Sequence, residues 1–184
     1  TASSIFLKYL ANQKFENFPK FEEIDFKNSN ITIINSTFQV NNIRIPIQLE
    51  RINNNTSIFE GDILVSKTID TPEGRAAIQN FAEGITKPWR NGKIPIAIDP
   101  DLSNTTRLNL YKALETMIQT FSSEDIPLNF TIAKNQANIL YITNANTGCF
   151  SQFIGMYPNF GGLLRLSEEC KSRDIVHEFG HVFG

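Results

Sequence analysis

The sequence has no long hydrophobic run, no excess of basic residues and very little histidine, cysteine or tryptophan. No stretch approaches the roughly 18 consecutive apolar residues of a membrane-spanning helix, which argues against a membrane protein. A net charge of −2 without a basic block argues against a nucleic-acid surface. The first residues, TASSIFLKYLANQ, lack a basic region followed by a long apolar one, so no signal peptide is visible. With 41% hydrophobic and 20% charged residues, the composition is that of an ordinary globular chain and excludes a collagen.

The only two histidines, His177 and His181, lie four residues apart within the segment DIVHEFGHVFG. Residues four apart share one face of a helix, so both imidazoles can reach one point in space. Neutral imidazole is a good zinc ligand, and a catalytic zinc takes three protein ligands and a water. Glu178 projects at a different angle and can act as general base toward that water. This is the HExxH pattern of zinc hydrolases.

The alternative is that two surface histidines flank a glutamate by chance on an ordinary helix. The neighbouring side chains argue against it, because they are apolar enough to make the helix a core element: Ile175, Val176, Phe179, Val182 and Phe183. A buried helix does not usually carry two histidines and a glutamate without a role for them. Gly184 stands where the longer pattern HExxHxxGxxH has its glycine, a residue that tolerates a left-handed turn.

Two upstream segments make the resemblance specific. The stretch WRNGKIPIAI, from Trp89 to Ile98, resembles the W-x-x-G-x-I-P-Y strand of the astacin family of zinc metallopeptidases, with Ile96 in place of the usual tyrosine. Residues 148–170 are similar to the stretch before the zinc helix of that family. The resemblance covers roughly residues 76–184. It implies an α+β fold of the astacin type, in which a twisted, mixed or mainly antiparallel sheet has a backing helix and a zinc-binding helix.

A second motif, FEGD, lies further upstream and reproduces the FxGD motif of astacin propeptides through Phe59, Gly61 and Asp62. The resemblance assigns to Asp62 the role of binding the catalytic zinc in place of water. A carboxylate oxygen is a competent zinc ligand, and its presence there would remove the nucleophile. Gly61 would let the backbone pass close to the metal. The alternative for this segment is a simple turn between two strands.

The N-terminal part has a β-rich pattern. Residues 30–40 and 42–49 alternate with period two, which predicts a hairpin or meander, and Pro46 suggests that the second strand is an edge strand. A short helix is predicted over residues 3–12, a loop over 53–57 and a linker over 67–75.

The C-terminal part alternates strands with a long helix. Strands are predicted over residues 93–99, 128–133, 138–143 and 163–167. A helix is predicted over residues 106–121, with Asp101 or Ser103 as its N-cap. One stripe of this helix is expected to be core: Leu110, Ala113, Leu114, Met117, Ile118 and Phe121.

Cys149 and Cys170 are the only cysteines. Two reduced thiols, or a cysteine that blocks the zinc, are interpretations that the residues themselves allow, whereas a C-x₂-C zinc pair is excluded by the spacing. The resemblance implies a disulfide between them and a secreted, extracellular protein. It also implies that an edge strand before the zinc helix aligns the substrate by adding it to the sheet. That strand is assigned to Leu163, Leu164, Arg165, Leu166 and Ser167.

The resemblance implies two domains, an inhibitory propeptide over residues 1–75 and the N-terminal part of a catalytic domain over 76–184. An activating protease is expected to cut within 74–78, where Arg75 suggests trypsin-like specificity. The third histidine of the family motif falls three residues after Gly184, followed by the methionine turn and a tyrosine. We therefore expect a fragment whose C-terminal partner segment supplies them.

The function implied is that of a latent, secreted zinc endopeptidase, with Zn²⁺ as cofactor, that acts on protein or peptide substrates and is inhibited by Asp62. Two alternatives remain open. One is a non-catalytic zinc-binding or adhesion module that uses the same helix structurally. The other is an inhibitor in which residues 1–75 act on a separate protease.

Overall fold

The computed structural model describes residues 1–25, 30–40, 43–53, 56–59, 61, 63–66 and 87–184. The helices in these ranges are α1 (Ala2–Ala11), α3 (Asn104–Ser123), α4 (Ser172–Phe183) and the short 3-10 helix η1 (Arg90–Gly92). The strands are β1 (Thr32–Val40), β2 (Ile43–Asn53), β3 (Thr56–Phe59), β4 (Ile63–Ser66), β5 (Lys93–Ile98), β6 (Asn129–Ile132), β7 (Ile139–Asn144), β8 (Cys149–Ser151) and β9 (Gly161–Leu166). The fold is therefore α+β, and the three α-helices predicted from the sequence are confirmed.

The described strands form one mixed sheet in the order β1-β2-β3-β4-β8-β9-β7-β5-β6. Strands β1 to β4 make an antiparallel meander, whereas β6, β5, β7 and β9 run parallel to one another. Strand β8 is antiparallel to β9. The two halves meet where β4 lies parallel to β8, through the single pair Ile63 and Ser151. The N-terminal meander is thus joined to the larger half of the sheet at one point.

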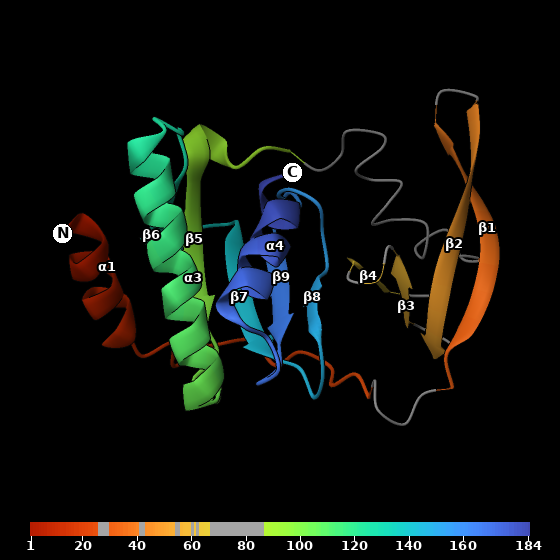
Figure 1. The fold of residues 1–184 in the computed structure, drawn as a ribbon, viewed down its shortest axis with the longest axis horizontal. Helices are drawn as coiled ribbons and strands as arrows, with labels where there is room; N and C mark the ends of the chain where they lie inside the picture. Colours follow the sequence, from red (N-terminus) through yellow and green to blue (C-terminus); the bar gives the residue numbers. More distant parts are fainter. Residues whose placement is uncertain (26–29, 41–42, 54–55, 60, 62, 67–86) are drawn as a thin grey trace.

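Helices α3 and α4 lie over one face of the parallel half of the sheet (Figure 1). Ser103 caps α3, because its hydroxyl accepts a hydrogen bond from the Thr106 amide at 3.2 Å, as the sequence predicted. Alternate residues of β5 and β7 belong to the core under the helices, and most of the residues between them are also at least partly buried, as in a parallel sheet covered on both faces. The core between helices and sheet contains Ile94, Ile96, Ile98, Leu110, Ala113, Leu114, Met117, Leu140, Ile142, Ile175 and Phe179.

The opposite face of the sheet is covered by the chain that follows α1. In Figure 1 this segment crosses the lower end of the sheet from the α3 side toward β8. Phe18 and Phe21 contact the ring of Tyr141, with centroid distances of 5.7 and 5.5 Å. Tyr141 lies between Leu140 and Ile142 in β7, and both of these belong to the core under the helices. Its ring therefore emerges on the other face.

Three sequence-based predictions need correction. Residues 163–167 do not form an edge strand, because β9 pairs with β7 on one side and β8 on the other and all five residues are buried. The loop predicted over 53–57 is wrong in part, because β3 begins at Thr56. The strand that contains Pro46, β2, is not an edge strand over its whole length, because it pairs with both β1 and β3. Its described pairing with β3 begins only at Leu49, so at Pro46 the strand pairs with β1 alone.

The linker predicted over residues 67–75, and the domain boundary after residue 75, lie outside the described residues. In the described part of the chain, none of the helices has both the length and the apolar character needed to cross a bilayer.

Candidate metal and active site on helix α4

The HExxH motif lies in the second half of α4. His177 and His181 are one turn apart, and their rings meet edge to face with 5.0 Å between centroids and 89° between planes. The His177 side chain is exposed and that of His181 is half-buried. The structure therefore brings the two predicted metal ligands together on one accessible face of the helix.

Glu178 lies beside His177 in α4, on the side of the helix that packs into the molecule. The carboxylate-bearing residue is only 3% exposed, which is rare for glutamate. Gly184 is the last residue of the sequence and has a φ of +100°. The positive φ explains why glycine is favoured at this position.

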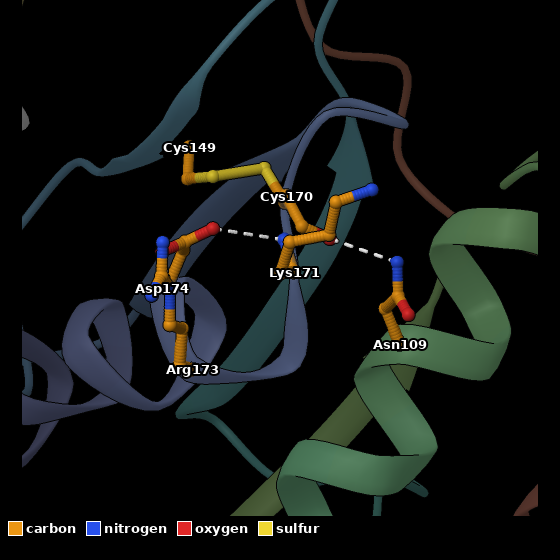
Figure 2. A network of polar contacts seen from close by, with 6 residues as sticks. All are labelled: Asn109, Cys149, Cys170, Lys171, Arg173 and Asp174. Carbon is orange, nitrogen blue, oxygen red and sulfur yellow. Dashed lines mark hydrogen bonds and ion pairs between the residues drawn. A yellow bond between two sulfur atoms is a disulfide. The ribbon is translucent and has the colours of Figure 1, made fainter.

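The beginning of α4 is fixed by three contacts (Figure 2). The Cys149–Cys170 disulfide joins β8 to the residue two positions before the helix, so the pairing implied by the resemblance is present. The Asn109 side-chain amide, from α3, donates to the Cys170 carbonyl at 3.0 Å. The Asp174 carboxylate accepts a hydrogen bond from the Lys171 amide at 2.9 Å. An acidic residue in the first turn also interacts favourably with the helix dipole.

The last turn of α4 is held from two other directions. The indole N–H of Trp89 donates to the Val182 carbonyl at 2.8 Å, and the contact is buried. The Gly155 amide donates to the His181 carbonyl, also at 2.8 Å. The last carbonyls of a helix have no partner within the helix, so these donors satisfy groups that would otherwise be left buried and unbonded. The sequence identified Trp89 only as part of the motif WRNGKIPIAI and did not predict its hydrogen bond to the end of α4.

The distance between the two histidine rings fits a shared zinc ion. A zinc about 2.0–2.1 Å from one nitrogen of each ring, at tetrahedral angles, would hold the ring centroids roughly 5 Å apart. The observed separation is 5.0 Å. Two imidazoles supply two of the three protein ligands of a catalytic zinc. Within the described ranges, no group of three or more histidine, cysteine, aspartate or glutamate side chains could hold a metal ion.

The N-terminal motif residues are described only in part. Phe59 ends β3, where it pairs with Leu49 and Ile63. Gly61 follows with φ of +86°, and among the described residues no atom lies within 4 Å of where a Cβ would stand. The positive φ accounts for a glycine at this position. Asp62 lies outside the described residues, so its predicted contact with the metal stays a prediction.

The strand that lies between the N-terminal meander and the rest of the sheet is β8. It pairs with β9 on one side, and Ser151 bridges to Ile63 of β4 on the other. Helix α4 packs against both β8 and β9. Sequence reasoning included β8 in the stretch before the zinc helix, but did not predict it as a strand, since it is only three residues long.

The mixed sheet and the histidine-bearing helix are those expected of a zinc metallopeptidase. Comparison with known protein families identifies the family to which the chain belongs. The profile of the peptidase family described as Astacin matches residues 81–184. The chain belongs to the astacin family. No curated protein matches the sequence.

One solved structure that resembles part of the chain is high choriolytic enzyme 1 (HCE-1), a hatching enzyme zinc-protease from Oryzias latipes (Medaka fish). The similarity covers 54% of this chain and 48% of that one, with 23% sequence identity and a TM-score of 0.37. The chain thus spans about half the length of that structure.

Proposed function

We propose that the complete protein is a secreted zinc endopeptidase that hydrolyses peptide bonds in protein or peptide substrates. The observation that carries the proposal is the HExxH helix in a chain of the astacin family, with two histidine rings 5.0 Å apart and a buried glutamate beside them. His177 and His181 would hold the zinc, together with a third ligand outside the described residues. The Cys149–Cys170 disulfide is consistent with an oxidising, extracellular location.

In this proposal, zinc supplies Lewis acidity toward a water molecule and the scissile carbonyl. Glu178 accepts the proton of the attacking water and then donates it to the leaving amine as the C–N bond breaks. The near-complete burial of Glu178 limits the number of positions that its carboxylate can adopt. The attachments at both ends of α4 hold the histidines and the glutamate in a fixed relation, which favours proton transfer over a short distance.

We further propose that the N-terminal segment, residues 1–75, keeps the enzyme latent, and that Asp62 binds the zinc in the latent state. Two features support this. The FEGD motif comes directly before β4, and β4 pairs with β8 through Ile63 and Ser151. Strand β8 packs against α4, so the strand that follows the motif and the histidine-bearing helix both contact β8. A cut between residues 74 and 78 would then release the block.

The test of the peptidase assignment is the variant Glu178→Gln in the complete, activated protein, with Glu168→Gln as the matched control. Glu168 is exposed and lies outside α4. We expect Glu178→Gln to lower kcat by about 10²–10⁴-fold while bound zinc, measured by atomic absorption, is unchanged. Glu168→Gln should leave both values at the level of the parent. Full activity in Glu178→Gln would refute the role of this residue, and loss of zinc and fold together would favour a structural metal module.

A further inference from the structure

The first 25 residues contact the larger half of the molecule through helix α1 and through the segment that follows it. Helix α1 packs against α3 and contributes Leu10, which is 1% exposed, to the main core. Phe6, Leu7 and Phe15 are partly buried against the same core. The outer side chains of α1 are different, since Ile5 and Tyr9 are 67% and 66% exposed. The helix therefore has one face that is built into the core and one that faces solvent.

The segment after α1 binds the opposite face of the sheet through aromatic rings. The Phe21 ring lies 5.5 Å from that of Tyr141 and 6.4 Å from that of Phe160, and the Phe18 ring lies 5.7 Å from Tyr141. The rings of Tyr141 and Phe160 are themselves 5.6 Å apart. Separations and tilts of this kind are favourable for aromatic pairs beyond the area that they bury. Phe18 and Phe21 thus pack on an aromatic surface formed by the rings of Tyr141 and Phe160.

The acidic end of the segment lies near a buried cation of the sheet. Arg165 of β9 is only 6% exposed, and burial lowers its pKa while the charge of Glu22 raises it. The Asn146 side chain donates to the Asp25 carboxylate at 3.3 Å. The sequence FENFPKFEEID, residues 15–25, therefore matches the surface in both its apolar and its charged part.

Strands β1 to β4 are attached to the larger half in another way. Among the described residues, they contact it through the Ile63–Ser151 pair and a small cluster in which Ile52, Ile58 and Leu64 pack with Phe150 of β8. Ile24, which belongs to the first 25 residues, also packs against this cluster. The aromatic contacts of the first 25 residues lie on β7 and on the β8–β9 connection, and helix α1 packs against α3.

We infer that residues 1–25 form a metal-independent anchor, distinct from the blocking strands, that stays bound to the catalytic half after the chain is cut between residues 74 and 78. The inference rests on the proposed function, since it concerns what happens at activation. In the cut protein the anchor is a non-covalent subunit of the enzyme. The aromatic surface of Tyr141 and Phe160 is then occupied by this segment and is closed to substrates.

The test uses the complete protein with a recognition sequence for a site-specific protease inserted after Arg75. After the cut, the N-terminal fragment is followed by gel filtration and mass spectrometry, with and without a zinc chelator. We expect the fragment to co-elute in both conditions. The variant Phe18→Ala/Phe21→Ala should release it about 100 times faster, because the three ring contacts with Tyr141 and Phe160 are lost. The control Ile5→Ala/Tyr9→Ala, on the exposed face of α1, should release it at the parent rate.

Each outcome has a definite interpretation, and none depends on peptidase activity. If the fragment were released only when the chelator is present, and at the same rate from the parent and from the Phe18→Ala/Phe21→Ala variant, the anchor inference would be refuted. The latency proposal would still stand. If the fragment stayed bound but the complete, activated protein had no peptidase activity, the proposed function would be refuted and the anchor inference would not. Circular dichroism before the cut checks that the double variant is folded. If it is not, Phe21→Leu is the milder substitution, with about fivefold faster release expected.

Discussion

The Cys149–Cys170 bond gives the most direct prediction, because it ties the start of the histidine-bearing helix to β8. The perturbation is the double variant Cys149→Ala/Cys170→Ala. The bond closes a loop with a sequence separation of 21 residues. In the chain-entropy relation, a loop of this size stabilises the folded state by about 3 kcal/mol. For a chain of this length, each kcal/mol changes Tm by roughly 2–4 °C, so we expect a decrease of about 6–12 °C.

The assay is thermal unfolding followed by circular dichroism, combined with amide hydrogen exchange. The parent protein treated with a thiol reductant is the control, and it should melt within a few degrees of the double variant. Exchange should increase first in the first turn of α4, because the helix begins at Ser172, only two residues after Cys170. A Tm within about 2 °C of the oxidised parent would refute the loop-closure reasoning, since a strongly ordered unfolded state or a compensating contact would be needed to explain it.

Two further predictions concern the other end of α4 and the proposed latent state. Trp89→Phe removes the buried donor to the Val182 carbonyl and should lower the free energy of unfolding by about 1–3 kcal/mol, measured by urea titration; an unchanged urea midpoint would show that another donor replaces the indole. Asp62→Ala in the complete zymogen should raise the rate of spontaneous activation. Glu60→Ala, in the variable position of the same motif, should leave it unchanged, and equal rates in the two variants would argue against Asp62 as the zinc-binding switch.

Much of the fold could be predicted because it depends on local patterns. The core stripe of α3 appears at helical spacing, and Leu110, Ala113 and Leu114 are all fully buried. The histidines lie one turn apart, so their meeting follows from helix geometry alone. Predictions of this kind need no knowledge of contacts between distant parts of the chain.

Strand position within the sheet could not be predicted in the same way. Residues 163–167 have the apolar character of a strand, but their place between β7 and β8 depends on pairing with strands that are distant along the chain or too short to predict. The Trp89–Val182 hydrogen bond spans 93 residues and has no local signal. The segment FENFPKFEEID is rich in charge, which favours a solvated loop, yet Phe18 and Phe21 are half-buried against the sheet.

The contact of Trp89 with the end of α4 also gives these 184 residues a built-in optical reporter. The sequence has a single tryptophan, its indole is 4% exposed, and its N–H is held by a carbonyl of the turn that contains His181. Emission from a dry, hydrogen-bonded indole shifts to longer wavelength and changes in intensity when water reaches the ring. A change in tryptophan fluorescence would therefore register loosening of this helix end directly, with no label and no background from a second indole in this part of the protein.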